Sequence, residues 1–151
     1  MRRILAVVTA VLFLLTGCGT STAAPAPKNA EEVFNTLSKQ LPAYDQQAAE
    51  VTVKLLGIDP ETVTNAYAGF AQDGGPQMLV VVEGVDNDAA LKAGERMNYY
   101  LTTLQNSAAQ YAPEQVDMLK SGYIYTKDNL AVMVVSDSVD QAKQELAKLL
   151  N

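Results

Sequence analysis

Apolar and polar residues recur along this chain with periods that predict helices and strands in a definite order. The first helix is expected to begin at Asn29, where Glu32 completes a capping box, and to end before Pro42. A second helix is predicted over residues 46–56, with its C-cap at Gly57 and an inner face that includes three apolar residues, Ala48, Val51 and Leu55.

Two strands and a long helix follow. Strands are predicted at 63–71 and 78–82, joined by the loop 73–76, whose two glycines suit a hairpin. The continuous apolar run at 78–82 indicates a central strand that is covered on at least one face. The helix is expected to open at 86–88 and to end before Pro113, and its apolar positions are Leu91, Gly94, Met97, Leu101, Leu104 and Ala108.

A second pair of strands, at 123–126 and 130–135, precedes a last helix that is capped by Asp137 or Ser138. The order predicts an α+β domain in which two ββα halves form a four-stranded, mainly antiparallel sheet. Its helices would pack on one face, preceded by one or two N-terminal helices. The expected core is Val33, Leu37, Val63, Leu79, Val81, Leu91, Leu101, Leu104, Met133, Val135, Ala142 and Leu146.

The N-terminus has the layout of an export signal. Two arginines precede an apolar run over residues 4–15, which is shorter than the ~20 residues that a membrane-spanning helix needs. The run leads into Leu15, Thr16, Gly17 and Cys18, which resemble the lipobox of bacterial lipoproteins. That resemblance implies lipidation of Cys18 and removal of residues 1–17. The protein would then be held at the outer face of the cytoplasmic membrane.

Composition narrows the chemistry that the mature chain can perform. Residues 18–28 form a Pro-, Ala- and Thr-containing tether, and residues 29–151 form a single domain. Loss of the two signal arginines would leave 9 of the 11 basic residues against 17 acidic ones, which argues against a nucleic acid partner. The chain has no histidine and one cysteine, so histidine-based nucleophile systems and metal sites are excluded, and no cofactor is expected.

Acidic residues at strand ends and turns are the candidates for an enzyme site. Two of them could form a carboxylate pair for glycoside chemistry, although capping and turn roles explain each one; they are Asp73, Glu83, Asp86, Asp128 and Asp137. The run Asp86-Asn87-Asp88 lacks the glycine and the distal Glu of an EF-hand and reads better as a helix cap. Tyrosine is favoured at interfaces, so Tyr99, Tyr123 and Tyr125 are candidates for an interaction surface.

The C-terminal half resembles a known family. Tyr111-Ala112-Pro113-Glu114-Gln115, Leu119 and the strand pair 123–135 are similar to small lipoproteins of Gram-positive anaerobes, a family known only as a domain of unknown function. The similarity extends over roughly residues 30–150. Where that family has a glycine in the last hairpin and a Glu early in the second strand, this chain has Asp128-Asn129 and Gln77. The resemblance implies a lipid-anchored surface domain and carries no catalytic residues over.

Two functions of different classes follow. We expect a non-enzymatic binding or assembly module that is held at the membrane by its lipid anchor and recognises a protein or another component of the cell envelope. The alternative is a carboxylate-dependent hydrolase that acts on envelope material. A receptor for small solutes is a third possibility, for which a single domain is small.

Overall fold

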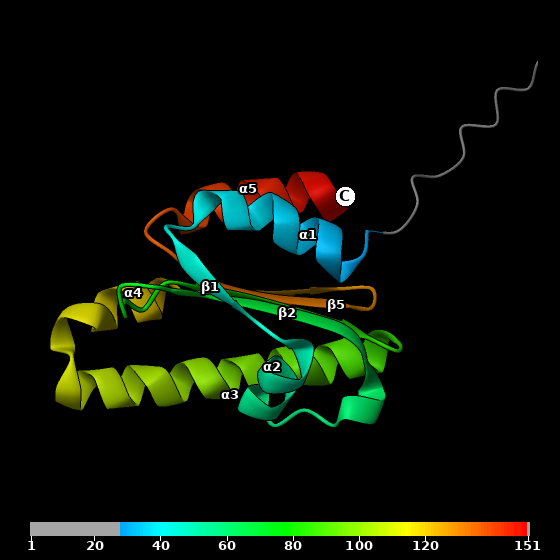
Figure 1. Ribbon diagram of the computed structural model, residues 1–151, viewed down its shortest axis with the longest axis horizontal. Coiled ribbons are helices and arrows are strands. Elements are labelled where there is room, and N and C mark those ends of the chain that lie inside the picture. Colours follow the sequence, from blue (N-terminus) through cyan, green and yellow to red (C-terminus); the bar gives the residue numbers. More distant parts are fainter. Residues whose placement is uncertain (1–27, 151) are drawn as a thin grey trace, which may run out of the picture.

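An antiparallel sheet forms the middle layer of the molecule, with helices on both of its faces (Figure 1). The computed structural model describes residues 28–150, and within them the sheet has five strands in the order β1-β2-β3-β5-β4. Their bounds are β1 (Tyr44–Gln47), β2 (Val63–Ala71), β3 (Met78–Gly84), β4 (Tyr123–Lys127) and β5 (Leu130–Val135). The predicted α+β class is therefore confirmed.

The helices form two separate layers. Two of them, α1 (Ala30–Leu37) and α5 (Val139–Leu150), cover one face of the sheet, and the other face is covered by α2 (Ala49–Leu56), α3 (Asn87–Tyr111) and α4 (Val116–Ser121) (Figure 1). Side chains of β3 alternate between the two layers. Met78, Val80 and Val82 pack in the cluster with α2, α3 and α4, whereas Leu79 and Val81 pack in the cluster with α1 and α5.

Caps and turns fall where the local sequence predicts them. Asn29 caps α1 by accepting a hydrogen bond from the N–H of Glu32 at 2.9 Å, and Asp86 caps α3 by accepting one from Ala89 at 2.8 Å. Gly57 ends α2 with a φ of 65°, which favours glycine.

The structure corrects the expected sheet. It has a fifth strand, β1, which lies where the second helix was expected to begin. The expectation that all helices pack on one face is wrong, because continuous apolar runs in β3 and β5 need cover on both faces. The two ββα halves are not confirmed: α3 and α5, the helices of the two halves, lie on opposite faces.

The expected inner face of α2 is also wrong. Val51 and Leu55 are 49% and 42% exposed, whereas Thr52, Val53 and Leu56 are buried. Burial of Thr52 is possible because its hydroxyl donates a hydrogen bond to the carbonyl oxygen of Ala48 at 3.2 Å.

Most of the expected core is buried, with three exceptions. Leu91 is 53% exposed because the buried stripe of α3 runs through Ala90, Ala93 and Met97, one position beside it. Val63 and Leu104 are half-buried and pack against the edge of the cluster. The remaining residues, which are buried, are Val33, Leu37, Leu79, Val81, Leu101, Met133, Val135, Ala142 and Leu146.

Candidate functional site

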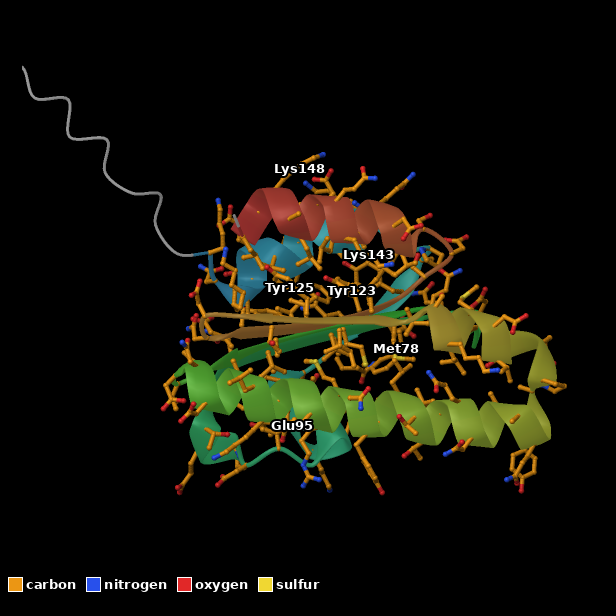
Figure 2. The ribbon with its side chains drawn as sticks, turned by 180° about the vertical axis from the view of Figure 1, so that it is seen from behind. Met78, Glu95, Tyr123, Tyr125, Lys143 and Lys148 are labelled. Carbon is orange, nitrogen blue, oxygen red and sulfur yellow. The ribbon has the colours of Figure 1, made fainter. Side chains whose placement is uncertain are left out.

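The candidate tyrosines do not form one surface. Tyr123 and Tyr125 lie on β4 between the sheet and α5 (Figure 2), with their rings stacked 6.2 Å apart. The ammonium group of Lys143 lies 5.3 Å from the centre of the Tyr123 ring, at cation–π distance. Tyr99 lies on α3, on the other side of the sheet, where it is 68% exposed. Tyr123 and Tyr125 therefore make contacts with each other, with Lys143 and with the core, so they are only partly available to a partner.

The candidate carboxylates are divided between the two ends of the sheet. Glu83 lies opposite Leu130, near the end at which α3 begins, whereas Asp137 follows the far end of β5. At about 3.3 Å per residue, these two carboxylates are roughly 20 Å apart, beyond the separations of about 5–10 Å that glycosidases use. Glu83 instead accepts hydrogen bonds from Ala30 and Asn129, and Asp73 accepts one from Gly75.

The lipobox residues Leu15, Thr16 and Gly17 and the lipidation candidate Cys18 lie outside the described residues. Among residues 28–150, no helix combines the length and the apolar character needed to cross a membrane. In the same range, no three acidic side chains come together as ligands for a metal ion.

A hollow that the sequence did not indicate lies beside α2 and β2. It has a volume of about 820 Å³ and is lined by Ala49, Glu50, Val53 and Lys54 of α2, by residues 57–60 and by residues 63–66 of β2. We call it the α2–β2 cleft. It exists because β1 pairs only with residues 68–71 of β2, after which the chain turns away into α2. The first half of β2 therefore has an edge without a neighbouring strand.

The segment between α2 and β2 forms part of the wall of this cleft. The N–H of Ile58 donates to the carbonyl oxygen of Val53 at 3.0 Å, which completes a Schellman motif around Gly57. Asp59 then accepts a hydrogen bond from the N–H of Glu61 and caps a 3₁₀ turn, Pro60–Thr62, that leads into β2. Two caps in succession hold this short connection in place.

Basic side chains line both this cleft, through Lys54, and a neighbouring hollow. A smaller hollow of about 490 Å³ adjoins the cleft through residues 57–59 and is also lined by Thr62, Lys92, Glu95 and Arg96. A Cβ atom placed on Gly57 would lie 3.6 Å from Nη2 of Arg96, so this guanidinium stands at the junction of the two hollows. Among residues 28–150, the ion pairs that form involve Lys28, Lys143 and Lys148, and none involves Lys54, Lys92 or Arg96.

A third hollow lies at the opposite end of the sheet, beside the β2–β3 hairpin. It has a volume of about 300 Å³, and Phe70, Met78, Tyr100, Leu104 and Leu119 contribute to its lining. Burial raises the pKa of the Tyr100 hydroxyl, so this group remains neutral over a wide pH range. These residues are mainly apolar and come from α3, α4 and the hairpin, so we interpret the hollow as a gap in the packing between these elements.

The α2–β2 cleft was missed because its cause is a mismatch in strand length. Residues 44–47 contain two glutamines and an aspartate, so their sequence gives no apolar alternation from which a strand could be recognised. One signal was present in the sequence. Ala48 and Ala49 separate the polar residues 44–47 from the apolar residues of α2, and this change could have indicated a boundary between a strand and a helix.

Comparison with known proteins identifies a family for this chain. The chain matches no curated protein and no solved structure. The family described as "Domain of unknown function (DUF4358)" matches residues 35–136, which is more than half of the 151 residues and contains the α2–β2 cleft. The expected resemblance to a family known only as a domain of unknown function is thus confirmed, and this chain belongs to the DUF4358 family.

Proposed function

We propose that this chain is a lipid-anchored, extracytoplasmic binding module that holds its partner in the α2–β2 cleft. The observation that carries the proposal is the cleft itself, a hollow of about 820 Å³ between a helix and a strand edge. Its volume falls in the range of about 300–1,000 Å³ that is typical of ligand sites. The anchor is inferred from Leu15, Thr16, Gly17 and Cys18 at the end of the export signal.

The character of the lining supports binding rather than catalysis. Ala49, Val53, Val63 and Ala66 give the cleft an apolar surface. Its two carboxylates, Glu50 and Asp59, are exposed to solvent, so neither has the dry surroundings in which enzymes tune a general acid or base.

Anchoring would make a weak site useful. A lipid-modified Cys18 confines the domain to the plane of the membrane, where its effective concentration toward neighbours at the same surface is high. A contact that is too weak to persist in free solution would then be sufficient. This argument favours a module that gathers or positions other envelope components.

Site-specific photocrosslinking in intact cells tests the use of the cleft. A photoreactive residue at Thr64, inside the cleft, should give crosslinked products that the same residue at Tyr99 does not give. The substitution Ala49→Trp should remove these products by filling the cleft, whereas Ala109→Trp on the exposed side of α3 should leave them unchanged. Equal crosslinking at both positions would contradict the proposal.

The hydrolase alternative has its own outcome in this test. If Thr64 gives no crosslinks, while a folded variant with Glu50→Gln and Asp59→Asn, the two carboxylates of the cleft, loses a measurable turnover of envelope material, the hydrolase replaces the binding module. The anchor is tested separately, by labelling cells with a fatty acid. The label should be incorporated by the natural chain and lost in Cys18→Ala, and retention of label and membrane association by the variant would exclude lipidation at this residue.

A further inference from the structure

We propose that the α2–β2 cleft binds a single-chain fatty acid, with the hydrocarbon chain between α2 and β2 and the carboxylate beside Lys54. This inference rests on the proposed function, because it names the chemical class of the ligand for the same cleft. The floor of the cleft, the side chains of its lining, its length, its lysine and its place relative to the anchor each support one step.

The floor of the cleft is continuous with the hydrophobic core. Val53 and Ala66 line the cleft and are 8% and 3% exposed, so they form its deepest part. Both belong to the core cluster on the α2 side of the sheet, and Ile58 and Val63, which also line the cleft, pack against that cluster. The side chains of this floor offer no hydrogen-bond donor or acceptor. The part of a ligand that enters the cleft should therefore be apolar.

The side chains of the lining narrow the class of apolar ligand. Six of the twelve lining residues are aliphatic, namely Ala49, Val53, Ile58, Pro60, Val63 and Ala66. None of the twelve is aromatic. A ligand that binds by stacking a flat ring on an aromatic side chain, as a nucleobase does, therefore finds no partner here. A hydrocarbon chain needs only the dispersion contacts that aliphatic side chains supply.

The length of the cleft matches a hydrocarbon chain of medium length. Its β2 wall comprises residues 63–66, which span about 13 Å. An extended hydrocarbon chain advances roughly 1.3 Å per carbon atom, so about ten carbons match this wall. Carbon atoms beyond this length would leave the cleft and add little to the affinity.

The proposed anchor would hold the cleft near a source of such chains. The N–H of Ala30, at the start of α1, donates to Glu83 at 3.2 Å, and Glu83 lies opposite Asn65 of the cleft wall. The start of α1 and the cleft are thus at the same end of the sheet (Figure 1). Residues 19–28 would span roughly 30 Å at about 3.1 Å each, so a lipidated Cys18 would keep this end close to the bilayer.

Competition with the bilayer selects a ligand with one chain. Burial of a methylene group is worth about as much in a bilayer as in an apolar cleft, so a lipid with two chains gains nothing by leaving the membrane. A single acyl chain gives only marginal and reversible membrane binding. A fatty acid can therefore exchange between the bilayer and the cleft.

Lys54 supplies the contact for the head group. It is the basic residue of the lining, it is exposed, and among residues 28–150 the ion pairs that form do not involve it. The carboxylate of Asp59 accepts a hydrogen bond from the N–H of Glu61, and Glu50 lies one helical turn before Lys54. Because Glu50 offsets part of the positive charge, the head group should contribute modestly and the chain should supply most of the affinity.

Equilibrium dialysis measures the binding. The full chain is reconstituted in phosphatidylcholine nanodiscs, protein-free discs serve as the reference, and the ligands are radiolabelled saturated fatty acids from hexanoate to tetradecanoate. The ligand retained in excess of the reference, at each free concentration in the buffer, gives the Kd. We expect the Kd to fall about fourfold per added methylene up to about ten carbons and by less than about twofold per methylene beyond that length.

A change in the width of the cleft tests the place of the chain. Ala49→Leu adds a larger aliphatic side chain to the lining, so the break in the chain-length series should move to shorter chains by about two carbons. Ala109→Leu, on the exposed side of α3, is the matched control and should leave the break unchanged. Thermal melts of the variants control for folding.

A comparison of head groups tests the role of Lys54. Decanoate should bind about threefold more tightly than monodecanoylglycerol, which has the same chain and no charge. Lys54→Gln should remove this difference, whereas Lys120→Gln, which removes an exposed cation outside the cleft, should preserve it.

The inference is overturned if no fatty acid is retained in excess of protein-free discs, if the affinity rises with chain length without a break, if Ala49→Leu leaves the break unchanged, or if decanoate and monodecanoylglycerol bind equally well. Its failure can be distinguished from failure of the proposed function. Crosslinked products at Thr64 should carry the mass of one fatty acid, and products that contain a protein instead would contradict the inference and support the proposed function. Absence of products at Thr64 would remove both.

Discussion

The carboxylate of Glu83, on β3, accepts a hydrogen bond at 3.2 Å from the backbone N–H of Ala30, the first residue of α1. The same side chain accepts a second hydrogen bond, at 3.3 Å, from the amide of Asn129 in the β4–β5 hairpin. A negative charge at the N-terminus of a helix is stabilised by the helix dipole. Glu83 thereby joins α1, the central strand and the hairpin at one end of the sheet, and this structural role accounts for its position.

Replacement of Glu83 should therefore lower stability. We expect Glu83→Gln to reduce the free energy of unfolding by about 1 kcal/mol, because the substitution removes the charge that faces the N-terminus of α1. Urea denaturation measures the change. Glu31→Gln, an exposed residue in the first turn of the same helix, is the matched control and should change stability by less than about 0.5 kcal/mol. Equal effects of the two substitutions would argue against the structural role of Glu83.

Two leucines of α3 separate the buried side of this helix from its exposed side. Leu101 is 5% exposed and Leu91 is 53% exposed. Leu101→Ala should lower the free energy of unfolding by about 2–5 kcal/mol through lost burial and a residual cavity. Leu91→Ala should change it by about 0.5 kcal/mol or less, as for exposed positions in general. Similar losses in chemical denaturation would show that the buried stripe of α3 is misplaced.

Gly94 permits α3 to lie close to β4. A Cβ atom at this position would approach Cγ2 of Thr126 to 2.6 Å. Gly94→Ala should therefore reduce stability by about 1–3 kcal/mol, although alanine is the better helix former. Thr126→Ser removes the clashing methyl group, so in that background Gly94→Ala should be neutral or stabilising. A double-mutant cycle measured by thermal melts tests this coupling, and additive losses would contradict it.

The half-buried Tyr100 should make stability sensitive to alkaline pH. Burial raises the pKa of this group in the folded state. Above about pH 10 the unfolded chain loses its tyrosine protons first, so the free energy of unfolding falls as the pH rises toward the folded-state pKa. Tyr100→Phe should reduce this loss, whereas Tyr99→Phe, at a 68% exposed position, should not. Urea titrations between pH 8 and 11 compare the slopes of the two variants.

Local signals predicted most elements, because caps and apolar runs are short-range features. Asn29, Gly57 and Asp86 each marked a helix end that the structure contains, and the run at 78–82 marked the central strand. The sequence analysis did not predict that helices cover both faces of the sheet, although β5 is buried along its whole length. An uninterrupted apolar strand of this kind already implies cover on both faces.

The candidate site was predictable only in part. Tyr123 and Tyr125 were correctly located on a strand, but their contact with α5 depends on which face that helix covers. The α2–β2 cleft arises because β1 is shorter than β2, and Lys92 and Arg96 of α3 line the neighbouring hollow through the packing of α2 on α3. Relations of this kind between distant segments leave no periodic trace in a single sequence.

The family match is shorter than the segment that the fold requires, which extends from α1 to α5. The family match covers residues 35–136, which omits α5 and more than half of α1. These two helices cover one face of the sheet, where Leu79, Val81, Val132 and Val134 are buried. A fragment cut at the limits of the match would turn this aliphatic face toward water and would be prone to self-association. A recombinant fragment should therefore begin before Asn29 and extend through Leu150.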